Sequence, residues 1–80
     1  MKLYIVSPEK TLYSGEADWV ALPGLKGAFM ILERHAPIIS GLGKGAVRYG
    51  SREETDSSFN IDGGFVEAKQ NVVTVCVEQE

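Results

Sequence analysis

Residues 27–37 carry the most informative pattern of the chain, an apolar strand that ends in a polar corner. They read Gly27-Ala28-Phe29-Met30-Ile31-Leu32-Glu33-Arg34-His35-Ala36-Pro37. Residues 29–32 are apolar on both faces of a strand, which predicts burial under a second sheet or under a partner. The residue before a proline is disfavoured in the helical region, so residues 35–37 are predicted to turn a corner instead of starting a helix.

Short strands are predicted on both sides of this corner. Turn residues punctuate the chain at Ser7-Pro8, Pro23-Gly24 and Asp62-Gly63-Gly64. Between such signals we expect strands over residues 3–6, 11–14, 17–22, 46–49, 57–61, 65–68 and 72–77, with a glycine-rich connector at 41–45 and a charged hairpin loop at 50–56. The last run is rich in β-branched residues, which favours a strand over a helix. Many short strands at this spacing predict an all-β sandwich or barrel, and 80 residues predict a single domain, 1–80.

Composition and charge narrow the classes of partner and site. The net charge is −3 with an isoelectric point near 5.1, and the basic residues are scattered, which argues against nucleic acid as the main partner. A single cysteine excludes an intramolecular disulfide, and one cysteine with one histidine excludes a Cys/His zinc site. The longest apolar runs are too short to span a bilayer, so any membrane association is expected to go through a partner. No cofactor is expected.

The residues leave three interpretations of the function open. A small enzyme or ligand-binding β-barrel could use His35 with Cys76 or with a carboxylate. A barrel of the OB type could bind nucleic acid, although the acidic balance and the lack of interleaved basic and aromatic residues disfavour it. A structural or interface role for His35 is favoured, because the sequence offers no second histidine and places Cys76 in an apolar strand.

Four segments, in order, resemble the ε subunit of the rotary F-type ATP synthase. The most specific is the corner His35-Ala36-Pro37-Ile38-Ile39. The others are the opening Val6-Ser7-Pro8-Glu9 with Leu12-Tyr13-Ser14-Gly15, the strand entry Gly45-Ala46-Val47-Arg48, and the closing pair Gly63-Gly64-Phe65-Val66-Glu67 and Asn71-Val72-Val73-Thr74-Val75. The resemblance runs from about residue 3 to residue 77, nearly the whole chain.

The resemblance implies a fold and a role. The fold is a flattened sandwich of two five-stranded sheets, and the family's carboxy-terminal helical hairpin, which can block rotation and in some members binds ATP, is expected to be absent. The role is that of a non-catalytic central-stalk rotor subunit, without a cofactor and not a homo-oligomer in function. It couples ion-driven rotation to ATP synthesis at the cytoplasmic face of the bacterial cell membrane, as a peripheral part of the F1 sector.

The resemblance also assigns contact residues to two partners. Ser7, His35 and Ile38 match positions near the γ subunit. Lys26, Ala28, Met30 and Leu42 match positions that face the membrane c-ring. Methionine adapts to irregular surfaces, so Met30 is the strongest candidate for a partner contact.

Overall fold

A computed structural model describes residues 1–51 and 57–79, and within these ranges it contains strands and no helix. The all-β prediction is confirmed. The strands are β1 Lys2–Val6, β2 Thr11–Glu16, β3 Trp19–Gly24, β4 Gly27–Leu32, β5 Ile38–Leu42, β6 Gly45–Gly50, β7 Ser57–Ile61, β8 Gly63–Lys69 and β9 Val72–Glu78. Of the predicted charged loop, residues 52–56 lie outside the described ranges.

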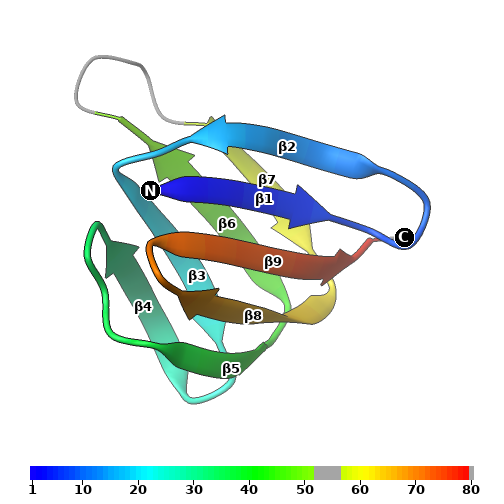
Figure 1. Cartoon of the computed structure of the whole chain (residues 1–80). Coiled ribbons are helices and arrows are strands. Elements are labelled where there is room, and N and C mark those ends of the chain that lie inside the picture. Colours follow the sequence, from blue (N-terminus) through cyan, green and yellow to red (C-terminus); the bar gives the residue numbers. More distant parts are fainter. Residues whose placement is uncertain (52–56, 80) are drawn as a thin grey trace.

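The strands form two layers (Figure 1). One layer has the order β2-β1-β9-β8-β5, and the other contains β3 with β4 on one side and β6-β7 on the other. The layers are joined where Gly24 of β3 pairs with Leu42 of β5, and two backbone hydrogen bonds flank this pair, from the Leu25 N–H to the Gly41 carbonyl and from the Gly43 N–H to the Pro23 carbonyl. The sandwich is therefore confirmed, with five and four strands in the described residues where the resemblance implies five and five.

Several predicted turns lie inside strands. Pro23 and Gly24 were expected to end a strand, but they pair with Ala28 and Gly27, so the reversal falls at residues 25–26. A proline is compatible with this position because Pro23 sits where β3 no longer pairs with β6, and it contributes its carbonyl, which accepts from the N–H of Gly43. The connector at 41–45 is likewise shorter than expected, because its first two residues belong to β5 and its last begins β6.

The core lies between the layers and is entirely apolar among the described residues. Alternate side chains of each strand point inward, as the period of two requires. The buried set includes Leu3, Ile5, Val66, Val73 and Val75 from one layer and Val20, Leu22, Val47 and Ile61 from the other. Tyr13 and Tyr49, with ring centroids 4.4 Å apart, pack beside this core.

Candidate functional site

Strand β4 buries one face and exposes the other. Ile31 is only 4% exposed, whereas Met30 and Leu32 are 55% and 56% exposed. Across the β3–β4 ladder Met30 lies opposite Ala21, and Leu32 lies opposite Trp19. The sequence-based alternatives for this strand were a second sheet or a partner, and the second sheet covers only one side. We call the exposed side, made of Trp19, Ala21, Ala28, Met30 and Leu32, the β4 patch.

A charged residue borders the β4 patch. The guanidinium carbon of Arg48, on β6, lies 5.9 Å from the centroid of the Trp19 ring, which is within cation–π range. Trp19 is half-buried, so part of its ring remains open to solvent beside Leu32. Contiguous apolar surface with a polar rim is typical of a protein-binding surface.

The 33–37 corner follows β4 directly and is held by two distant segments. The α-ammonium group of Met1 lies 2.6 Å from Oε1 of Glu33 and also donates to the carbonyl of Ala17 at 2.9 Å. The backbone N–H of Arg34 donates to Oδ1 of Asn71 at 3.0 Å. In Figure 1 the loop after β4, the turn between β8 and β9 and the N-terminus lie on the same side of the molecule.

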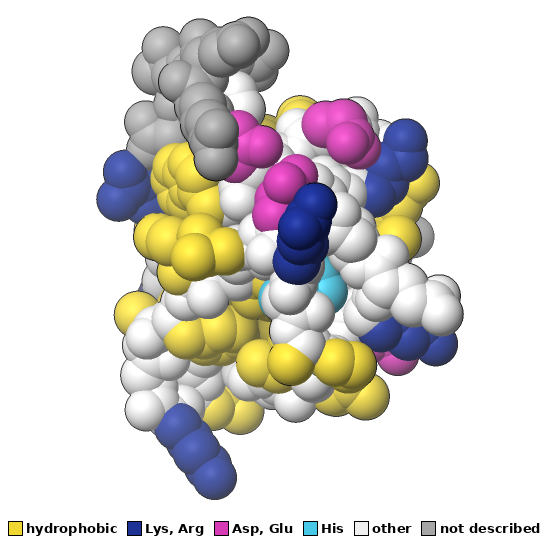
Figure 2. Space-filling view, turned by 60° about the vertical axis from the view of Figure 1, so that its left-hand side comes forward, with side chains coloured by type: hydrophobic (Ala, Val, Ile, Leu, Met, Phe, Trp, Pro, Cys, Tyr) yellow, Lys and Arg dark blue, Asp and Glu magenta, His cyan; other side chains and the backbone are white. Residues whose placement is uncertain are grey.

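His35 lies within this corner, and its ring makes no hydrogen bond to an acidic or nucleophilic side chain in residues 1–51 and 57–79. Its Nδ1 is 3.1 Å from the carbonyl oxygen of Ala36, which can only accept, so Nδ1 is the donor of this hydrogen bond. Nε2 is buried and has no hydrogen-bond partner in the described residues. Figure 2 views this side and shows hydrophobic side chains gathered beside the histidine, with acidic and basic side chains around it.

The proposed pairing of His35 with Cys76 has no structural support. Arg34, which precedes His35, contacts Asn71 just before β9, whereas Cys76 lies four residues after Val72 on that strand. At about 3.3 Å per residue, Cys76 lies roughly 13 Å along β9 from the end of the strand that adjoins the corner. The enzyme interpretation therefore loses Cys76 as a nucleophile that His35 could activate.

The residues predicted to contact γ do not share one surface. His35 and Ile38 lie together at the corner and at the start of β5. Ser7 lies in the turn after β1, where its N–H donates to the carbonyl of Lys10 at 2.8 Å. The pairing of Lys2 with Val72 and of Val6 with Cys76 puts this turn at the opposite end of the layer from the corner. Figure 1 shows the two loops on opposite sides.

Three of the four residues predicted to face the c-ring are exposed on one hairpin. Lys26 lies in the turn between β3 and β4, and Ala28 and Met30 point outward from β4. Leu42 differs, because its side chain is only 4% exposed and belongs to the core. Its predicted partner-facing role therefore does not fit its position: β5 continues through Leu42, which turns this side chain inward.

A second apolar surface lies on the outer face of the other layer, and sequence reasoning missed it. Leu25, Ile39 and Phe65 are 72%, 77% and 53% exposed. They are contiguous, because the Leu25 side chain covers Gly41, and Gly41 pairs with Phe65. We call them the β5–β8 patch. The signal that could have found it is the doublet Ile38-Ile39, since adjacent apolar residues in a strand point to opposite faces.

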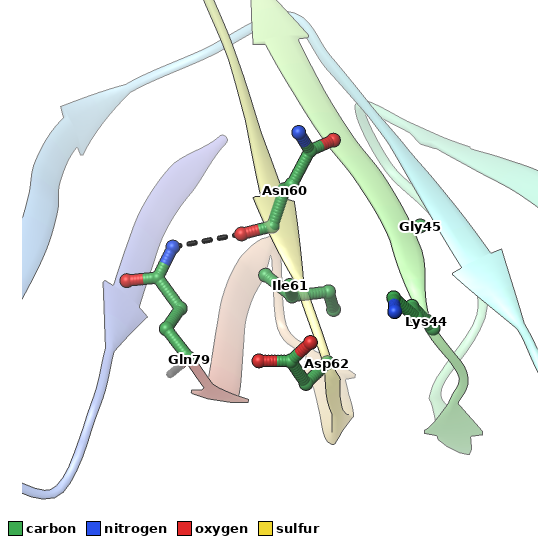
Figure 3. Close-up of a pocket in the computed structure, with 6 residues that line it drawn as sticks. All are labelled: Lys44, Gly45, Asn60, Ile61, Asp62 and Gln79. Carbon is green, nitrogen blue, oxygen red and sulfur yellow. Dashed lines mark hydrogen bonds between the residues drawn. The ribbon is translucent and has the colours of Figure 1, made fainter.

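The structure also contains a hollow of about 460 Å³ with polar and apolar lining (Figure 3). It is lined by Lys44, Gly45, Asn60, Ile61, Asp62 and Gln79. The Nε2 amide of Gln79 donates to the carbonyl of Asn60 at 2.8 Å, which ties the end of β9 to β7. Among residues 1–51 and 57–79 no group of three potential metal ligands gathers here or elsewhere. No helix in the same ranges is long and apolar enough to cross a membrane.

Comparisons with known proteins identify the relatives of this fold. Residues 1–79 match the family described as "ATP synthase, Delta/Epsilon chain, beta-sandwich domain". A protein named ATP synthase epsilon chain from Chlorobium limicola is 42% identical over 77 residues, covering 96% of this chain and 88% of the relative. Another of that name, from Leptospira borgpetersenii, is 37% identical over 78 residues, covering 98% of this chain and 61% of the relative. The chain thus spans about three-fifths of the second relative.

Solved structures share the fold at low sequence identity. One chain in the cryo-EM structure of the Tetrahymena thermophila mitochondrial ATP synthase, central stalk and c-ring, superposes with a TM-score of 0.84 at 14% identity. The match covers 98% of this chain and 63% of that one. A chain in the Euglena gracilis mitochondrial ATP synthase gives a TM-score of 0.87 at 16% identity, covering 94% and 48%.

Proposed function

Because this chain belongs to the family of ATP synthase delta/epsilon β-sandwich domains, we propose that it is a central-stalk rotor subunit that links γ to the c-ring. The carrying observation is the family match over residues 1–79 on a sandwich that exposes apolar patches on both outer faces. A rotor link needs two separate docking surfaces and a stiff body between them, and two packed β-layers supply both. Its contribution is mechanical, and it performs no chemistry of its own.

The c-ring surface, in this proposal, is the outer side of the β3–β4 hairpin. Lys26 and Ala28 are exposed at and beside its turn, and Met30 continues the same outward row into the β4 patch. A flexible apolar side chain next to a basic tip suits the irregular polar loops of a ring of identical subunits. Leu42 is left out of this surface because its side chain is buried.

The γ surface, in this proposal, is the 33–37 corner with the start of β5. His35 lies there beside Ile38, whose half-buried side chain packs against the core, and the neighbouring Ile39 points to the outer face and begins the β5–β8 patch. Ser7 contacts γ only if γ reaches the opposite end of the same layer. The complex would be the F1 sector at the cytoplasmic face of a bacterial membrane, reached only through the partner subunits.

Reconstitution with the partner subunits tests this function. The chain, mixed with γ and with detergent-solubilised c-ring from the same source, is expected to co-purify with both. Met30→Glu is expected to weaken capture of the c-ring at least tenfold, because a carboxylate would be buried in an apolar contact. Ser14→Glu, exposed on the edge strand β2, is the matched control and is expected to bind normally. The proposal is contradicted if the unaltered chain fails to bind γ or fails to bind the c-ring.

A further inference from the structure

The backbone of the turn between β8 and β9 does not require the asparagine found at position 71. Gln70 and Asn71 have φ angles of 52° and 61°, so both are left-handed, as in a two-residue type I′ hairpin turn. Glycine is the favoured residue at the second position of this turn, because it adopts positive φ without a Cβ clash. Backbone geometry alone would therefore be served at least as well by glycine at position 71.

The Asn71 side chain has a contact outside its own hairpin. Its Oδ1 accepts the backbone N–H of Arg34 at 3.0 Å, across 37 positions of sequence. Its backbone carbonyl accepts the N–H of Lys2 at 3.0 Å, just before β1 and β9 begin their parallel pairing. One residue thus joins the start of β1, the β8–β9 turn and the 33–37 corner.

The corner needs such a contact because its backbone is strained. Arg34 has a φ of 60°, in the left-handed region that costs a residue with a Cβ about 1–2 kcal/mol. It lies outside the strands, between the end of β4 and the start of β5, so no ladder holds it. Strained conformations persist where neighbouring groups hold them in place.

We propose that Asn71 is a positioning residue, whose side-chain amide holds the 33–37 corner in the shape that docks its partner. This inference rests on the proposed function, in which that corner meets γ. It explains why asparagine occupies a position where the turn favours glycine. The hydrogen bonds of Asn71 outside its hairpin go to Arg34 and Lys2 and not to Lys26, Ala28 or Met30, so its loss should leave the c-ring surface unchanged.

Two substitutions at position 71 separate positioning from stability. Asn71→Gly keeps the turn and removes the acceptor, whereas Asn71→Asp keeps an acceptor oxygen at nearly the same place. In Asn71→Gly we expect the thermal midpoint to be unchanged or higher, the Arg34 amide to exchange with solvent about tenfold faster, and γ affinity to fall about threefold to tenfold. Asn71→Asp is expected to restore slow exchange and affinity. Gln70→Gly, in the same turn, is the matched control and should alter neither.

Each outcome of this experiment is decisive. Unchanged Arg34 exchange in Asn71→Gly overturns the inference, as does an Asn71→Asp variant that behaves like Asn71→Gly. Faster exchange with unaltered γ affinity also overturns it, because the unaltered chain measured alongside shows that the partner is competent. Failure of the unaltered chain to bind γ is a different result, since it contradicts the proposed function itself, whereas the exchange data still report whether the amide contact exists.

Discussion

Glu33 is the residue through which the corner meets the start of the chain. Its side chain is 51% exposed, whereas the α-ammonium group that it contacts at 2.6 Å also makes a buried hydrogen bond, to the Ala17 carbonyl. A buried cation without its counter-charge is unfavourable, so this pair differs from an ordinary surface ion pair. The Met1 side chain, 2% exposed, adds apolar packing at the same place.

The first prediction concerns this pair. Glu33→Gln keeps the shape of the side chain and removes its charge, so the Met1 ammonium keeps the Ala17 carbonyl and loses the Glu33 carboxylate as its counter-charge. We expect a loss of roughly 1 kcal/mol in the free energy of unfolding, measured by urea titration. Glu16→Gln is the control: its carboxylate lies 4.0 Å from the Lys2 ammonium, both side chains are more than half exposed, and the effect should be near zero. Equal losses in the two variants would contradict the argument.

Residue chemistry predicted parts of the candidate site but not all. The corner at His35-Ala36-Pro37 could be predicted because proline restricts the residue before it, and Met30 could be flagged because β4 is apolar on both faces. Leu42 could not be placed, because the sequence predicted it in the connector 41–45, whereas β5 continues through it and turns its side chain inward. Glu33 and Asn71 were missed because their partners are 32 and 37 positions away along the chain.

At the scale of elements, two glycines occupy positions that disfavour a side chain, and the physical reasons differ between them. Gly64 has a φ of 145°, and a Cβ built on it would lie 2.0 Å from the Cys76 carbonyl oxygen on β9. Gly27 has a φ of 129°, and its Cβ would meet no atom within 4 Å. Both positions disfavour a side chain through φ, but only Gly64 also faces a backbone clash.

The second prediction uses this pair as a matched comparison. Gly27→Ala carries the φ cost alone and should lower the free energy of unfolding by roughly 1–2 kcal/mol. Gly64→Ala carries the same cost and also forces β8 away from β9, so we expect a loss of roughly 3 kcal/mol or more. Chemical denaturation of both variants measures the difference. Equal losses would show that β8 relaxes without disturbing the ladder.

The sequence predicted the existence of the strands better than the residues at which they begin and end. Period-two patterns and turn residues located the strands, because those signals arise from local sterics. Glycine was expected to mark turns or connectors at positions 24, 41, 63 and 64, which the structure places within strands. At Gly41 and Gly64 the reason is tertiary, since Leu25 covers the first and the β9 backbone approaches the second. Neighbours of that kind are not visible along the chain.

At the scale of the whole molecule, the sandwich exposes more apolar surface than its own packing requires. The β4 patch and the β5–β8 patch belong to different layers, and they adjoin where β4 lies near β5, because Ala28 and Ile39 line one hollow there. A body with principal extents of 30 × 23 × 20 Å, held by a continuous apolar core, is well suited to transmit force between two partners.

The third prediction follows from the linkage between binding and stability. A partner that binds only the folded chain stabilises it, by about 2.7 kcal/mol when its free concentration is one hundred times the dissociation constant. Adding γ should therefore raise the thermal midpoint of the chain by several degrees, measured by following a fluorophore attached to the chain alone. Ile39→Glu, on the β5–β8 patch, should leave the midpoint of the isolated chain nearly unchanged, because this side chain is 77% exposed, yet it should remove most of the shift. Met30→Glu, on the opposite layer, should keep the shift with γ and lose the one produced by the c-ring. An identical response of both variants to both partners would contradict the assignment of one partner to each face.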